Sequence, residues 1–419
     1  MEWPSLAGAA ALMGALALAG AAEAQVDLVS PETVHGMIDL RLAGVDGERS
    51  FVDGGFGKTR FSGAADGDFK LHATVAEAAL EWTPRLNWEW SALVDVDVQP
   101  GQEKPVDISQ AYVLFKPVPL SQTRFQAKFG YFYPPVSLEH DGRFWSVTNT
   151  ITPSAINSWI GEEVKVLGAE GSVSRDFGDA SLSASAALFG FDDTSGTLLT
   201  YRGWALHDLK STAHGEFPLP PLSEFAEYVQ DGETYSALEI DKRVGFYARV
   251  EWRPVGPVTL DALYYDNRGD KVGVAHGLQW AWRTTFTNVG LSVKASETTR
   301  IKGQVIVGRT LMGFPTGDGL FADVVFRSAY GLISHDIGDS TLTGRVDLFD
   351  VRDHSLKVID NNDEHGWSAT AAFRHKFSEH ADFRLEALRV SSHRPSRALG
   401  GLAPRQGQTL LQSSLRLTF

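Results

Sequence analysis

Apolar and polar side chains alternate along many stretches of this chain that are about ten residues long. Segment 243–253 is typical, because its even-numbered residues from Val244 to Trp252 are apolar while Arg243, Arg249 and Glu251 occupy odd positions. A repeat of two predicts a β-strand with one face in an apolar environment and the other in water. The chain is therefore predicted to be all-β.

Sixteen segments with strand character follow one another to the end of the chain. They are approximately 33–42, 69–82, 86–99, 106–116, 123–131, 161–174, 180–192, 242–253, 257–267, 278–294, 299–309, 320–335, 340–352, 364–377, 381–393 and 408–419. Most match the roughly 9–11 residues that a tilted strand needs to cross a bilayer, and exceed the roughly five or six that are usual in soluble sheets. Phase slips within 69–82, 278–294 and 381–393 predict bulges. The pattern predicts a transmembrane antiparallel β-barrel of sixteen strands.

The connections between these segments alternate in length. The long connections are approximately 43–68, 132–160, 193–241, 310–319, 353–363 and 394–407, whereas the short ones are turns rich in Pro, Gly and Asp. Outer-membrane barrels have short periplasmic turns and longer outer loops. Counted from a periplasmic N-terminus, sixteen strands place every long connection outside.

Composition excludes several other classes of protein. The chain has 419 residues, no Cys and a net charge of −14. The absence of Cys removes disulfides and thiolate metal sites, and the negative charge argues against nucleic acid as a partner. After the N-terminus, no apolar run reaches the roughly 20 residues of a transmembrane helix.

The N-terminus has the features of a secretion signal. An Ala-, Leu- and Gly-rich core at 7–22 precedes Ala22-Glu23-Ala24, where a signal peptidase would cut. We expect a signal peptide at 1–24 and a single barrel domain at 25–419, in the outer membrane of a Gram-negative bacterium. The leading segment holds Glu2 and neither Lys nor Arg. An uncleaved anchor helix is therefore the alternative.

The chain ends on a strand whose last residue is Phe419. This ending resembles the C-terminal assembly signal of bacterial outer-membrane proteins. The resemblance implies that the barrel-assembly machinery recognises Phe419. A closed barrel would also pair this last strand with the first, which removes an exposed sheet edge.

The alternation assigns charges of both signs to the inside of the barrel. The basic residues are Lys116, Arg124, Lys128, Arg249, Lys302, Arg345, Arg374, Lys376, Arg384 and Arg416. The acidic residues are Glu89, Asp95, Asp97, Glu251, Asp261, Asp323, Asp347 and Glu386. An Arg or Lys facing lipid at mid-bilayer costs about 2–4 kcal/mol, which favours this assignment. We expect Arg124, Lys128, Arg249, Arg345, Arg374, Arg384, Arg416, Asp95 and Asp97 to line a pore, with no excess of one sign large enough to decide its selectivity.

The third long connection holds the most distinctive motif. The stretch from Lys128 to Glu139 reads KFGYFYPPVSLE, followed by His140, Asp141 and Arg143. It resembles the start of the third loop in the phosphate-selective porin O/P family. That resemblance implies a sixteen-stranded barrel, usually trimeric, whose third loop folds inward and forms the constriction. Glu139, His140, Asp141 and Arg143 are the expected constriction residues.

This sequence also departs from that family. Its predicted interior has no basic excess, and Thr148-Asn149-Thr150 stands where the family's Glu-Arg-Ser segment is expected. We therefore expect a passive channel for small hydrophilic or charged solutes. A phosphate- or anion-selective channel is the alternative.

The fourth long connection is acidic, from Asp193 to Asp241, and is expected to form a solvated outer loop that binds lipopolysaccharide or concentrates cations. No catalytic motif is complete: Gly54-Gly55-Phe56-Gly57-Lys58-Thr59 is similar to a phosphate-binding loop, but Val52 replaces its first glycine. We expect no cofactor and no enzymatic activity. The rivals to a porin are a barrel lipase or protease and a plugged structural or adhesive barrel.

Overall fold

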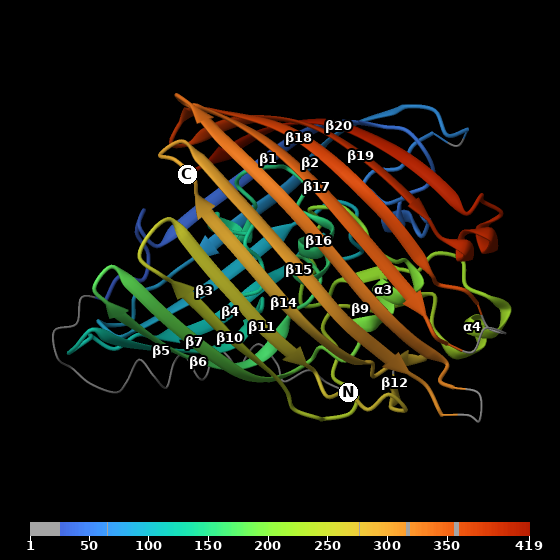
Figure 1. The fold of residues 1–419 in the computed structure, drawn as a ribbon, viewed down its shortest axis with the longest axis horizontal. Helices are drawn as coiled ribbons and strands as arrows, with labels where there is room; N and C mark the ends of the chain where they lie inside the picture. Colours follow the sequence, from blue (N-terminus) through green and yellow to red (C-terminus); the bar gives the residue numbers. More distant parts are fainter. Residues whose placement is uncertain (1–25, 65, 276, 316–318, 356–359) are drawn as a thin grey trace.

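The computed structural model describes residues 26–64, 66–275, 277–315, 319–355 and 360–419. The expected signal peptide at 1–24 lies outside the described residues. Among those described, sixteen antiparallel strands close into one barrel, which confirms the predicted class and strand number (Figure 1). No described helix combines the length and apolar character needed to cross a membrane.

The barrel strands follow the chain in order around the wall. They are β1 (Val34–Val45), β2 (Lys70–Trp82), β3 (Trp90–Val98), β4 (Val106–Phe115), β5 (Thr123–Phe132), β6 (Val166–Phe177), β7 (Ala180–Gly190), β10 (Gly245–Arg253), β11 (Val258–Asp266), β14 (Arg283–Lys294), β15 (Thr299–Met312), β16 (Ala322–Ile337), β17 (Ser340–Asp353), β18 (Glu364–Ser378), β19 (Ala381–His393) and β20 (Arg405–Thr418). Short turns join them at one end and longer loops at the other.

Smaller elements lie within the loops. They are β8 (Glu216–Pro218), β9 (Glu233–Tyr235), β12 (Val274–Ala275), β13 (Gln279–Trp280), α2 (Ala155–Ile160), α3 (Gly196–Tyr201), α4 (Glu224–Val229) and three 3₁₀ turns at Phe51–Asp53, Arg143–Trp145 and Pro395–Gly400. We name the loops by order: loop 1 is 46–69, loop 3 is 133–165 between β5 and β6, and loop 4 is 191–244 between β7 and β10.

The two faces of the wall sort as the alternation predicts. On β17, Leu342 and Leu348 face outward and are 48% and 59% exposed, whereas Arg345 and Asp347 face inward and are almost fully buried. Of the predicted bulges, the one in 69–82 is confirmed, because the register between β1 and β2 shifts beside Asp39. The other two predictions were wrong: β14 pairs without interruption from Arg283, and the bulge near β19 lies in β18, between Lys376 and Ser378.

The last strand closes the barrel against the first. β20 pairs with β1 from Met37 to Val45, and the backbones of Gly36 and Phe419 exchange two hydrogen bonds of 3.1 Å. A Cβ atom on Gly36 would lie 2.1 Å from the ring of Phe419. Glycine at this position therefore lets the terminal aromatic ring lie against β1 at the seam.

Candidate functional site: the lumen and its inward loops

Loop 3 crosses the lumen and is held by the opposite wall. Glu139 pairs with Arg345 of β17 at 3.2 Å, and its second carboxylate oxygen accepts hydrogen bonds from the Ser154 amide and the Asn157 side chain. Arg345 also donates to the carbonyl oxygens of Thr152 and Pro153. These buried contacts fix both the start and the helical part of loop 3 to β17, which confirms the inward-folded third loop.

Three further wall residues extend this attachment. Gln304 of β15 accepts from the Leu138 amide and donates to the Val136 carbonyl. Glu386 of β19 accepts from the backbone amides of residues 151 and 152, and Arg384 donates to carbonyl oxygens of residues 147 and 150. Loop 3 is therefore attached to three strands of the far wall, β15, β17 and β19.

The four predicted loop 3 residues have different surroundings. Glu139 and His140 are buried, the latter between the Ser137 hydroxyl at 2.7 Å and Glu162 at 2.9 Å, with its ring stacked on Trp145. Burial lowers the pKa of His140 to about 3 despite the nearby carboxylate of Glu139, so the imidazole is neutral at physiological pH. Both residues position the loop.

Asp141 and Arg143 keep about half of their side chains exposed. Asp141 pairs with Lys302 of β15 at 2.6 Å, and Arg143 pairs with Glu81 of β2 at 3.3 Å. The two opposite charges lie on different sides of the loop backbone, toward different parts of the wall. They are the exposed charged side chains of loop 3.

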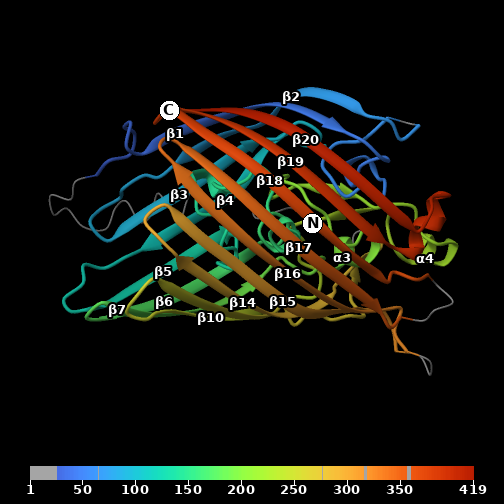
Figure 2. The ribbon, with the colours of Figure 1, turned by 45° about the horizontal axis from the view of Figure 1, so that its top comes forward.

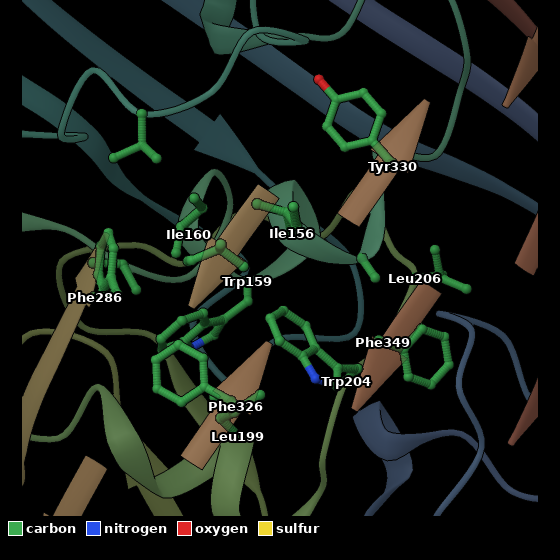
Figure 3. Packing of buried hydrophobic residues seen from close by; sticks show 14 of the residues in the cluster. Ile156, Trp159, Ile160, Leu199, Trp204, Leu206, Phe286, Phe326, Tyr330 and Phe349 are labelled. Atoms are coloured by element: carbon green, nitrogen blue, oxygen red, sulfur yellow. The ribbon is translucent and has the colours of Figure 1, made fainter. Parts of the chain in front are cut away.

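Loop 4 also enters the lumen, whereas its sequence predicted a solvated outer loop. Its first half contributes Leu199, Trp204 and Leu206 to a buried cluster that includes Trp159 of α2 and Phe326 of β16. Figure 3 shows the two indole rings between the loops and the wall strands, with Phe326 against both. The expectation of a wholly solvated loop 4 is therefore wrong for residues 192–212, almost all of which are buried. The apolar side chains of this part of the loop pack on loop 3, which removes them from water.

Lys210 of loop 4 is the charged centre of a second contact. Its ammonium group donates to Glu77 of β2 at 2.5 Å and to the Phe144 carbonyl of loop 3. The acidic groups around it, Asp97 and Asp95 of β3 and Glu162 of loop 3, raise its pKa well above the usual range although burial opposes this. Lys210 thus connects loop 4, loop 3 and the wall.

Asp95 and Asp97, predicted to line the pore, lie inside this contact. Both are fully buried and no carboxylate oxygen of either has a hydrogen-bond partner among the described residues. Lys165, at the end of loop 3, is a second buried cation in the same region and donates to the carbonyls of Ser109 and Ser211. The two aspartates therefore balance buried lysines beneath the loops.

Two polar cavities lie at the short-turn end of the lumen, on either side of loop 3. One, of about 410 Å³, is bounded by Arg143, Arg374, Arg384 and Arg416 together with Asp382. We call it the arginine vestibule. The Nε atoms of Arg374 and Arg416 are buried and have no hydrogen-bond partner among the described residues. Four predicted basic residues thus converge here, three of them from β18, β19 and β20.

The second cavity, of about 330 Å³, lies against β5, β6, β7 and β10. Lys128 pairs there with Glu170 at 3.4 Å, and Arg249 pairs with Glu251 and Asp261. Arg124 lies closer to the turns, paired with Asp176. These charges compensate one another, so this cavity has no surplus of either sign.

One assigned lumen charge is misplaced. Asp323 lies on the outer face of β16, where it forms two hydrogen bonds with Arg309 of β15 at 2.6 and 2.7 Å. The residues next to it, Ala322 and Val324, are buried inside. The error arose because an outward ion pair at the loop end of a strand lies beyond the apolar belt, where a charge no longer has to face the lumen.

Sequence reasoning missed the residues that hold the two loops together. Arg202 and His207 of loop 4 both bond to Glu163 of loop 3, and His207 also donates its backbone amide to the Ser158 hydroxyl. The available signal was the density of apolar residues in 198–209, which includes Leu198, Leu199, Trp204 and Leu206. A solvated acidic loop has no need of them.

No family model matches the sequence, and no curated protein matches it significantly. Solved structures share its fold. The anion-selective porin from Comamonas acidovorans is 13% identical over 92% of this chain and 99% of that chain, with a TM-score of 0.52. The outer membrane channel DcaP of Acinetobacter baumannii is 10% identical over 93% and 99%, also at 0.52. A trimer form of OmpT, an outer membrane protein of Vibrio cholerae, is 9% identical over 92% and 99%, at 0.50. The chain therefore has the fold of a bacterial outer-membrane barrel.

Proposed function

We propose that this protein is an outer-membrane porin through which small hydrophilic or charged solutes diffuse without an energy source. The observation that carries the proposal is loop 3, which lies across the lumen and leaves a charged cavity on each side. Solutes would be filtered by the width and the charge of the lumen at loop 3, where Asp141 and Arg143 remain exposed.

Loop 4 makes this a restricted channel and not a wide general pore. The cluster around Trp159 and Trp204 occupies the loop-end half of the lumen and includes wall residues of β1, β5–β7, β10, β11, β14–β17, β19 and β20. The sector along β1–β4 is filled as well, by buried ion pairs of Arg41 and Lys210 with carboxylates. We expect a conductance well below that of an unobstructed barrel of this size.

A preference for anions is the second candidate, and the arginine vestibule favours it. Four guanidinium groups border this cavity, and two of their buried Nε donors have no partner among the described residues. A planar carboxylate or a phosphate would satisfy such donors. The acidic half of loop 4 at the opposite end favours cations, so the two ends of the lumen have opposite local charge.

The test is conductance of the purified protein in a planar bilayer under a KCl gradient. Discrete open steps are expected, and the sign of the reversal potential reports whether the vestibule or the acidic mouth governs ions. A barrel that inserts without conducting would overturn the porin and favour a plugged adhesive barrel. Turnover of lipid or peptide substrates in detergent would instead support the barrel lipase or protease, which we do not expect.

We further propose a homotrimer. The matched OmpT structure is described as a trimer form, and the fold is shared along almost the whole of both chains. Light scattering of the detergent-solubilised protein, corrected for bound detergent, should give three times the mass of one chain. A monomer mass at every protein concentration would contradict this assembly.

A further inference from the structure

The outer wall carries an apolar groove of about 1070 Å³ on the face formed by β16–β20, β1 and β2. Figure 2 shows these strands side by side. The floor of the groove follows a single row of directly paired, outward-facing residues. The row is Ile333, Gly344, Ala371, Ala387, Leu411, Gly44 and Leu71. Neighbouring strands lie about 4.8 Å apart, so the row of seven residues is roughly 29 Å long. Because the strands are tilted in the membrane and the row runs at right angles to them, the row crosses the apolar belt obliquely.

The groove exists because small residues on the floor lie between larger ones. A Cβ atom built on Gly344 meets nothing within 4 Å, so the space above it is open. The neighbouring row toward the short turns contains Leu342, Phe373 and Leu385, which are paired with one another and form one side of the groove. The ring of Phe69 closes the far end over Gly44.

The loop end of the same face carries a row of Arg and His residues with one aspartate among them. The paired, outward-facing residues in that row are Arg327, Asp350, His365, His393 and Arg405. Arg352 joins them through Asp350, which also pairs with Arg327, and both arginines keep more than half of the side chain exposed. We call this set the basic row. Along β18 it lies six residues from the floor of the groove, or roughly 20 Å.

We propose that this face binds a phosphorylated glycolipid of the outer leaflet, with its phosphate on the basic row and an acyl chain in the groove. Guanidinium groups bind phosphate through paired, charge-assisted hydrogen bonds. Inside a membrane, packing and not the hydrophobic effect holds apolar groups together, and a floor of Gly and Ala allows close approach. The loop end of an outer-membrane barrel faces outside, which places the basic row at the outer-leaflet headgroups.

The charges on this face disfavour a second copy of the chain as the occupant. Arg389 extends from the row beside the floor, about half exposed and paired with Asp46 at 3.6 Å, and the basic row lies above it. Two barrels packed here would bury Arg327 and Arg352 with one shared carboxylate, Asp350, and burial of the uncompensated charge costs several kcal/mol. A phosphate headgroup instead supplies the missing negative charge.

The experiment is native mass spectrometry of the full mature protein in detergent with added bis-phosphorylated lipid A, dephosphorylated lipid A or phosphatidylglycerol. We expect one bis-phosphorylated molecule to be retained per chain, and roughly tenfold weaker retention in A371F/A387F, where two aromatic rings fill the groove. These substitutions point outward and exchange one apolar group for another, so the barrel should fold. The matched control is A186F/A248F, a directly paired outward-facing alanine pair on β7 and β10, which should retain lipid as the wild type does.

The phosphate end is tested separately with R327Q/R352Q, which should bind both forms of lipid A equally weakly. Equal retention of all three lipids by the wild type, or unchanged retention in A371F/A387F, would overturn the proposal and leave only annular lipid. Loss of oligomers in A371F/A387F with lipid retention unchanged would assign the face to a contact between copies. None of these readouts depends on whether the barrel conducts.

Discussion

Loops 3 and 4 both fold into the lumen, but different forces hold them there. Loop 3 is attached to the far wall by buried charges and amides, above all the pair between Glu139 and Arg345. Loop 4 makes its inner contacts with loop 3 and with the wall, through apolar packing around Trp204 and through the ion pairs of Lys210 with Glu77 and of Asp208 with Arg41. Loop 3 therefore depends mainly on charged contacts with the far wall, whereas loop 4 adds a large apolar cluster. This difference makes the two loops separable by mutation.

The largest effect should follow from removing the inner half of loop 4. Replacement of residues 196–209 by a flexible Gly/Ser linker deletes its contribution to the apolar cluster while leaving the anchors of loop 3 on β15, β17 and β19. We expect single-channel conductance to rise by roughly threefold or more, since a water-filled lumen replaces a packed one. The comparable replacement of residues 220–231 in the outer half is the control. It should leave conductance near the wild-type value.

If both replacements raise conductance equally, the restriction is not specific to the inner half of loop 4. The porin proposal would survive this outcome. Unchanged conductance in both would remove loop 4 from the path.

The next effect concerns the contact that joins the loops. Lys210→Met keeps the length of the side chain but leaves Glu77, Asp95 and Asp97 without the cation that they surround. Breaking such a buried pair costs on the order of 3–5 kcal/mol. We expect this cost to destabilise the ordered loops and to leave the barrel folded. We expect faster hydrogen exchange in 141–148 and 205–212, and larger current fluctuations. Lys210→Arg should restore part of the protection, and identical exchange in Lys210→Met and wild type would refute the role.

Glu139→Gln should have a smaller effect that is confined to loop 3. Arg345 keeps its pair with Asp347, and the amide of Gln retains one acceptor for Asn157, so the loss is about 1–3 kcal/mol. Exchange should increase in 137–157 while the strands remain protected. Exchange that increases first in loop 4 would mean that Glu139 does not act mainly on loop 3.

The architecture was predictable because a membrane imposes a strong local rule. Each strand of the wall must show apolar residues to lipid and tolerates charge inside, so the period of two marks the strands, as the faces of β10 and β17 illustrate. The rule weakens where lipid ends. Asp323 was placed inside for this reason, although it pairs with Arg309 on the outer face.

The lumen was less predictable, since its contacts join residues far apart in the sequence. Glu139 meets Arg345 and Lys210 meets Glu77, and no local pattern pairs them. The motif at 128–139 indicated that loop 3 turns inward. It did not distinguish Glu139 and His140, which are buried anchors, from Asp141 and Arg143, which remain exposed. Burial of a loop residue depends on the other loops, and loop 4 has no motif of this kind.

The smallest expected effect is a dependence of amide exchange on pH in the outer half of loop 4. Glu216 of β8 lies beside Glu103 and Glu233, with carboxylate oxygens within 4.8 Å of one another, and its partial burial and these neighbours raise its pKa to about 7. A carboxyl group whose pKa is higher in the folded than in the unfolded state favours folding most at low pH. Its contribution to stability is fully present below the ordinary pKa of 4.5 and is lost as the pH rises through about 7. We expect the amides of β8 and β9 to exchange faster at pH 8.5 than at pH 5.5 after correction for intrinsic rates, while residues 198–209 are unchanged. Glu103→Gln should abolish the difference, and Glu224→Gln in α4, outside this group of carboxylates, should not. A pH response that persists in Glu103→Gln would mean that the outer half of loop 4 is governed by contacts other than this carboxylate group.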